Sequence, residues 1–163
     1  MMQLREGPKA SFLEAAMQAK LLHEASGQRT FTVVLATGDE VLSCLQEFVE
    51  RENIHAATFT AIGALSDAVL CYFDWEKKEY EKIPVCEQVE VAALIGDVAD
   101  DPNGKPTLHI HLVVGTRDGI AKAGHLGEAH VRPTLEVILT ESPAHLRKVK
   151  DDETGLALIR PAA

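Results

Sequence analysis

The sequence predicts an α+β fold in which an antiparallel-rich β-sheet packs against one main α-helix. Only residues 37–54 carry apolar side chains at helical spacing, whereas alternating and β-branched runs fill most of the remaining chain. The expected strands recur about every ten residues and are separated by short polar turns. This arrangement favours antiparallel pairing, because parallel strands need long crossover connections.

The segment before the helix predicts two strands. Residues 17–24 and 29–36 are joined by a turn at the sequence ASGQ, and the second run alternates and is rich in β-branched residues. A chain of 163 residues is one domain on the usual size distribution. We expect residues 1–16 to be a frayed N-terminal extension and residues 17–163 to form a single domain with the fold described above.

The helix has recognisable start and stop signals. Thr37 followed three residues later by Glu40 is typical of a capping box, and Asn53 suits the left-handed conformation that ends a helix. Between them lies one apolar face with helical spacing, made by Val41, Leu42, Leu45, Phe48 and Val49.

Strand signals dominate after the helix. Short polar turns at 74–80 and 100–106 separate several of these runs, and a glycine-flanked stretch covers 120–131. The tail after residue 141 mixes a charged segment with a last apolar run. The strands predicted in this part of the chain are 56–65, 67–75, 79–85, 87–99, 107–115 and 133–141.

Composition narrows the classes of function. Apolar residues make up 46% of the chain, enough for a real core, which excludes a disordered or collagen-like protein. The formal net charge of −9 argues against a general nucleic-acid binder, because binding to a phosphate backbone depends on positive charge. DNA remains a candidate partner that the net charge does not favour. The apolar runs are far shorter than the roughly 20 residues of a membrane span, so no membrane association is expected.

Cysteine usage and the N-terminus indicate a cytoplasmic protein. Cys44, Cys71 and Cys86 are widely spaced and form neither a C-x-x-C pair nor an even disulfide framework. The first twenty residues contain charges and lack the apolar core of a secretory signal. We therefore expect a cytoplasmic location with reduced, mostly buried thiols.

The strongest chemical signal is the pair His109 and His111. Residues i and i+2 of a strand project from the same face, so one metal ion can reach both imidazoles. His125 is a candidate third ligand, and Gly124 beside it would allow a neighbouring strand to approach closely. Three protein ligands plus water are typical of catalytic zinc. The alternative is that the pair consists of half-buried histidines hydrogen-bonded to carbonyl groups.

Other polar residues are weaker candidates. The candidates to hydrogen-bond and orient the metal ligands are Glu90, Glu128 and His130. Glu90 and Glu128 are also candidate general bases. Their alternative interpretation is ordinary surface polarity. No G-x-S-x-G elbow, P-loop or G-x-G-x-x-G motif is present, so catalytic residues stay unassigned. No role is assigned to the remaining histidines, His23, His55 and His145.

The order of these motifs resembles that of the PPC (also PCC) domain, a family shared by plants and prokaryotes. The resemblance covers residues 17–160 and rests on FTAIGAL at 59–65, H-x-H at 109–111 and AGHL at 123–126. It implies an α+β fold and a homotrimer. It also implies that a zinc-type metal, found on three histidines in some prokaryotic members, would here be held by the histidines of the second and third motifs, His109, His111 and His125.

The chain differs from the plant branch of this family. Plant members are nuclear proteins with an AT-hook, and no such Arg-Gly-Arg core occurs in this sequence. The stretch 87–92 also lacks the Gly-Arg pair of the plant partner-contacting motif. The resemblance therefore implies the stand-alone prokaryotic type.

Three functions follow as hypotheses. The first is a homotrimeric, metal-binding regulatory or DNA-associated interaction module. The second is a zinc-dependent hydrolase or lyase that acts on a small molecule. The third is a small-molecule sensor without turnover, with its ligand at the subunit interface.

Overall fold

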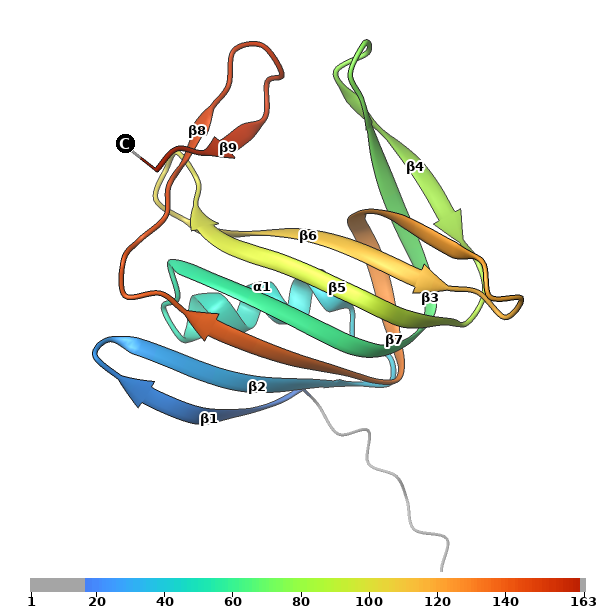
Figure 1. The fold of residues 1–163 in the computed structure, drawn as a ribbon, viewed down its shortest axis with the longest axis horizontal. Coiled ribbons are helices and arrows are strands. Elements are labelled where there is room, and N and C mark those ends of the chain that lie inside the picture. The colour runs from blue at the N-terminus through green and yellow to red at the C-terminus, as the bar shows by residue number, and fades with distance from the viewer. Residues whose placement is uncertain (1–16, 162–163) are drawn as a thin grey trace, which may run out of the picture.

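The computed structural model describes residues 17–161, and the predicted N-terminal extension 1–16 lies outside the described residues. Figure 1 shows one large curved sheet with a helix behind it and a small hairpin near the C-terminus. The elements in chain order are β1 (Gln18–Ala25), β2 (Gln28–Ala36), α1 (Val41–Arg51), β3 (Ala56–Asp74), β4 (Glu79–Val85), β5 (Val89–Asp100), β6 (Pro106–Gly115), β7 (Ala121–Glu141), β8 (Lys148–Lys150) and β9 (Ala157–Ile159).

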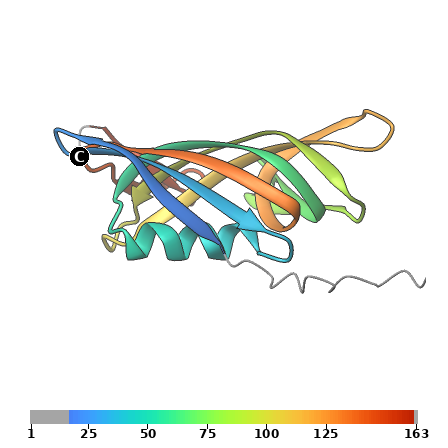
Figure 2. The same cartoon turned by 90° about the horizontal axis from the view of Figure 1, so that it is seen from below.

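The sheet confirms the predicted fold class. Seven strands are ordered β1-β2-β7-β6-β5-β3-β4, β8 and β9 form a separate pair, and the pairings between these strands are all antiparallel. The helix α1 is the only one between residues 17 and 161. It covers one face of the sheet, as the edge-on view in Figure 2 shows.

Two long strands close part of the sheet on itself. β3 pairs with both β5 and β7, β5 pairs with β6, and β6 pairs with the first residues of β7. These four strands thus form a closed circuit of hydrogen-bonded neighbours. Gly63, at a bulge in β3, has φ of +152°, and a Cβ there would stand 2.2 Å from the Thr134 carbonyl oxygen. A glycine is needed where the two strands approach this closely.

The core lies between the helix and one face of the sheet. Phe48 of α1 makes an edge-to-face contact with Phe31 of β2, with ring centroids 5.3 Å apart. In β6 the buried residues alternate with exposed ones, so Ile110 faces the core while His109 and His111 face solvent. The histidine pair therefore stands on the sheet face that the helix leaves uncovered.

The structure corrects the predicted start of the helix. Glu40, rather than Thr37, is the N-cap: its carboxylate accepts hydrogen bonds from the backbone N–H groups of Leu42 and Ser43. The hydroxyl of Thr37 instead donates to the Pro133 carbonyl oxygen across the sheet. The predicted stop is confirmed, because Asn53 has φ of +54° just after the helix.

Two other boundaries also differ from prediction. The runs 56–65 and 67–75 form the single strand β3, and the stretch 120–131 joins 133–141 in the single strand β7. Bulges and register shifts keep these strands continuous where the apolar pattern breaks. The tail forms the β8–β9 hairpin, whose short strands the mixed sequence does not predict.

Two general expectations can be compared with the described residues. No helix between residues 17 and 161 is long and apolar enough to cross a bilayer. The cysteines are free thiols, but Cys44 and Cys71 are only half-buried and Cys86 is exposed, so the prediction of mostly buried thiols is wrong.

Candidate metal centre

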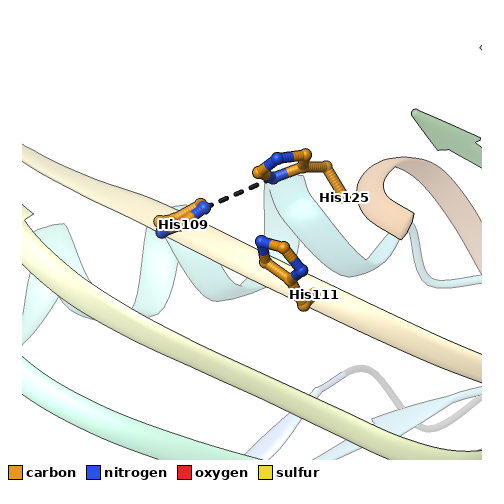
Figure 3. Close-up of side chains that lie close together, drawn as sticks. All are labelled: His109, His111 and His125. Atoms are coloured by element: carbon orange, nitrogen blue, oxygen red, sulfur yellow. Dashed lines mark hydrogen bonds between the residues drawn. The ribbon is translucent and has the colours of Figure 1, made fainter. Parts of the chain in front are cut away.

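Two neighbouring strands bring three histidines together. His109 and His111 project from β6, and His125 on β7 is the cross-strand partner of His111. The His111 and His125 ring centroids are 4.1 Å apart, and the His109 ring lies 5.1 Å from each. Figure 3 shows the three rings gathered above β6, with the helix on the far side of the strand. Their ligand nitrogens lie within 4.8 Å of one another.

Close strand packing holds the backbone of His125. A Cβ at Gly124 would lie 2.8 Å from the Cys71 carbonyl oxygen and 3.2 Å from the Leu70 Cβ. The expectation that Gly124 permits close approach of a neighbouring strand is therefore confirmed. This packing places His125 opposite both β6 and β3, where its ring reaches the pair on β6.

Hydrogen bonds orient two of the rings. Nδ1 of His109 lies 3.2 Å from Oδ2 of Asp97, its cross-strand partner on β5, so Nε2 points to Nδ1 of His125 at 3.3 Å. The latter contact is the dashed line in Figure 3. The Tyr80 hydroxyl lies 3.4 Å from Nε2 of His125. A carboxylate on the far nitrogen of an imidazole is the usual support for a metal-ligating histidine.

The surroundings of His111 and His125 favour the neutral form of these two imidazoles. Burial, with a contribution from the neighbouring histidines, lowers the pKa of His111 and of His125 below the usual range. A neutral imidazole keeps the lone pair that a metal needs. Three nitrogen donors, a supporting carboxylate and partial exposure thus form a donor set that fits a zinc-type ion with a position left for water.

A cavity of about 560 Å³ adjoins the cluster. His109 and His125 line one side, and residues of the β3–β4, β5–β6 and β8–β9 hairpins line the rest. Phe73 and Tyr80 come from the β3–β4 hairpin, whereas Leu156 and Leu158 come from the β8–β9 hairpin. The volume is in the range of small-molecule sites, and the lining is mostly apolar with a few polar groups, as such sites are.

A buried lysine, Lys148, also faces this cavity. Lys148 Nζ donates to Oγ1 of Thr107 at 3.2 Å and lies 3.8 Å from Oδ1 of Asp97. Burial lowers the pKa of Lys148, while the Asp97 carboxylate opposes that shift. Asp97 thus connects the lysine to the histidine cluster, a role that the sequence spacing does not predict.

The other predicted site residues lie elsewhere on the sheet. Glu90 on β5 pairs with Gly115 near the far end of β6. His130 Nδ1 lies 2.9 Å from Oδ1 of Asp67, and its Nε2 is 3.9 Å from Oε1 of Glu128. The hydrogen-bond partners found for the three-histidine cluster are Asp97 and Tyr80, so a supporting role for these other residues stays a prediction.

The structure also brings together a group of residues for which no sequence motif predicts a role. His55 and His145 stack at the end of β5, with ring centroids 4.8 Å apart, beside the buried carboxylate of Asp100. These residues come from three segments that are far apart in the chain. Only the tertiary fold brings them together, and no local motif could have revealed them.

Comparison with known proteins agrees with this fold. The model of the Plants and Prokaryotes Conserved (PCC) domain matches residues 22–143. A plant- and prokaryote-conserved protein from Pyrococcus horikoshii is 31% identical, with a TM-score of 0.75 over 88% of this chain and 94% of that one. A metal-containing protein from Archaeoglobus fulgidus is 34% identical, with a TM-score of 0.75 over 90% of this chain and 99% of that one.

A third similar structure is described by DNA binding and not by a metal. It is a candidate DNA-binding protein from Ralstonia eutropha, 29% identical, with a TM-score of 0.74 over 80% of this chain and 90% of that one. Among curated proteins, no significant match is found. The family match spans most of the chain and includes the sheet, the helix and all three clustered histidines, so this chain belongs to the Plants and Prokaryotes Conserved (PCC) domain family.

Proposed function

We propose that the protein is a homotrimeric regulatory or DNA-associated module that holds a zinc-type ion on His109, His111 and His125. The convergence of these three imidazoles on one exposed sheet face is the observation that carries the proposal. Zinc on three imidazoles keeps a position for water and lowers the pKa of that water to about 7. The protein's own contribution is to hold the rings in place, through Asp97 at His109 and Tyr80 at His125.

The exposed sheet face supports assembly into a trimer. Ile95 is the cross-strand partner of His111 and is 58% exposed, and Ile62 and Ile138 on the neighbouring strands are also exposed. Large aliphatic side chains on one face are an expected site of subunit contact. Association across this face would bury these isoleucines and bring the histidine clusters of different subunits close to the interface.

Metal analysis combined with mass measurement tests this proposal. By elemental analysis, the His109→Ala variant of the full chain should contain about one zinc per chain less than wild type. Light scattering should still give the mass of a trimer. His23→Ala, which changes an exposed histidine on β1, is the matched control and should keep the full zinc content. Equal zinc content in both variants would contradict the metal site, and a monomer in the wild type would contradict the trimer.

DNA association needs its own experiment. The similar Ralstonia protein is described as a candidate DNA-binding protein, whereas the net charge of −9 opposes direct binding to phosphates. Fluorescence anisotropy with a duplex across a salt series separates direct contact from contact through a partner. We expect weak binding that disappears as salt rises, and no binding at low salt would contradict direct association.

A second candidate function is supported by the cavity beside the cluster. A mostly apolar cavity of about 560 Å³ that borders two of the three histidines suits a small-molecule ligand, for turnover by a zinc-dependent hydrolase or lyase or for sensing. Zinc-loaded protein should then hydrolyse an ester, phosphoester or lactone, or be stabilised against heat by a metabolite. Turnover that persists unchanged in His111→Ala would contradict the zinc-dependent reaction.

A further inference from the structure

A second cluster of metal-binding side chains lies at the end of β5. His55 precedes β3, Asp100 is the last residue of β5, and His145 lies in the loop between β7 and β8. Nδ1 of His55 is 2.6 Å from Oδ1 of Asp100, and Nδ1 of His145 is 3.9 Å from Oδ2 of the same carboxylate. The two imidazole rings are stacked with 10° between their planes.

The Asp100 carboxylate is far more buried than the two histidines beside it. Its side chain is only 5% exposed, whereas the side chain of His55 is 20% exposed and that of His145 is 60% exposed. A buried carboxylate needs a compensating positive charge or hydrogen bonds to both oxygens. Oδ1 has a short contact with His55, but the nitrogen of His145 stands beyond hydrogen-bond length from Oδ2. The second oxygen therefore faces the His145 imidazole without a direct hydrogen bond between them.

The donor atoms have the right types and nearly the right separations. One atom from each residue can be chosen so that all lie within 4.8 Å of one another. Two ligands on one zinc ion stand at most about 4 Å apart, twice the bond length. The 3.9 Å from Nδ1 of His145 to Oδ2 of Asp100 lies within that limit, and the exposed place of His145 in a loop permits its ring to adjust around an ion. Two imidazoles and one carboxylate are a donor set for divalent zinc-type ions.

We propose that His55, Asp100 and His145 form a second binding site for a divalent zinc-type ion. It shares no residue with the three-histidine cluster and does not depend on it. Asn53 Oδ1, 3.3 Å from Nε2 of His55, holds the far side of that ring and leaves Nδ1 directed at the carboxylate. The ion binds where three separate segments of the chain meet.

Binding here fixes the C-terminal hairpin to the sheet. The backbone N–H of Asp100 already donates to the Leu146 carbonyl oxygen at 2.8 Å, and Asp100 forms a bridge with Arg147 immediately before β8. A cation on the neighbouring His145 adds a link at the same point. Because Leu156 and Leu158 of this hairpin line the cavity beside the first cluster, the second ion stabilises one wall of that cavity.

Zinc titration of the full chain tests this site. With the three-histidine cluster removed by the double variant His109→Ala/His111→Ala, we expect about one zinc equivalent per chain to remain bound in equilibrium dialysis. Adding His145→Ala should abolish that equivalent, whereas adding His23→Ala should leave it. Equal binding with His145→Ala and with His23→Ala would overturn the proposal, and so would the absence of zinc on the double variant while it is folded by circular dichroism.

Protease protection gives a second measurement that does not depend on counting metal. Zinc should slow limited proteolysis after Lys148 or Lys150 by several-fold in the double variant, and His145→Ala should remove the effect. His145 is largely exposed, so this substitution leaves the core intact. Cleavage rates that zinc does not change would contradict the link between the ion and the hairpin. A different result would contradict the three-histidine site, namely equal zinc content in wild type and in His109→Ala.

Discussion

Nδ1 of His109 lies 3.2 Å from the carboxylate of Asp97, which faces it directly across the β5–β6 pair. This contact fixes the ring and leaves Nε2 available toward His125. Asp97→Asn keeps the shape of the side chain but removes its charge. We expect zinc affinity at the three-histidine cluster to fall about 10- to 100-fold while the zinc content at saturation stays the same.

A competition titration with a chromophoric chelator measures this effect. The His145→Ala background leaves one proposed site to titrate, and Asp152→Asn, an exposed aspartate in the turn between β8 and β9, is the control. An affinity for Asp97→Asn equal to that of the control would mean that the carboxylate does not support the ligand.

Gly124 should limit how well His125 is placed. In Gly124→Ala the new Cβ would stand 2.8 Å from the Cys71 carbonyl oxygen, so β7 must shift away from β3. We expect a loss of about 1–3 kcal/mol in the free energy of unfolding, measured by urea denaturation, and weaker zinc binding.

Gly115→Ala is the matched control for that substitution. A Cβ at Gly115 meets nothing within 4 Å, so its stability should change by no more than about 0.5 kcal/mol. Similar results for the two variants would show that the close approach at Gly124 has no energetic consequence.

The N-cap of the helix can be tested at the predicted residue, Thr37, and at the observed one, Glu40. Glu40 accepts hydrogen bonds from Leu42 and Ser43, whereas Thr37 bonds across the sheet. Glu40→Ala should cost about 0.5–2 kcal/mol in the free energy of unfolding because it leaves two helix N–H groups unpaired. Thr37→Ala should cost less, and the opposite ranking would favour the capping box that the sequence suggests.

The pair His130 and Asp67 predicts a dependence of stability on pH. The hydrogen bond and charge of Asp67 raise the pKa of His130, and the same hydrogen bond lowers the pKa of Asp67. A raised folded-state pKa stabilises the protein below the unfolded value of about 6.5, and this contribution is lost as the pH rises through the folded value. The lowered pKa of Asp67 has the opposite pH dependence. Its contribution to stability is present above the unfolded pKa of Asp67 and is lost in more acidic solution.

Urea denaturation of wild type and His130→Gln at two pH values measures this contribution. The difference in unfolding free energy between wild type and His130→Gln should be larger at about pH 5.5 than at about pH 8.5. Asp67→Asn should give the same pattern, and the two substitutions together should not be additive. A difference that is equal at both pH values would show that the ion pair does not contribute.

Local patterns predicted much of the fold because periodicity is set by neighbours in the chain. The apolar spacing around Leu45 and the alternation around Ile110 are such patterns, and the structure has a helix and a strand there. The motif H-x-H likewise placed His109 and His111 on one face. Where the pattern breaks, as at the bulge near Gly63, the sequence could not show that the strand continues.

Long-range register accounts for what the sequence did not predict. Asp97 supports His109 only because these two positions pair across β5 and β6, and Tyr80 reaches His125 from a different hairpin. His55 and His145 meet Asp100 only after β3, β5 and the segment that follows β7 are in place. No spacing in the chain encodes these contacts, so an imidazole or carboxylate in a polar stretch is indistinguishable from ordinary surface polarity.

The most direct test of the central claim is the anomalous X-ray signal from crystals of the zinc-loaded protein, collected at the zinc absorption edge. The account predicts a peak between the rings of His109, His111 and His125, with a nitrogen of each at about 2.0–2.1 Å. Absence of a peak there at full zinc loading, with the three rings turned apart or into solvent, would contradict it, whatever is found beside Asp100.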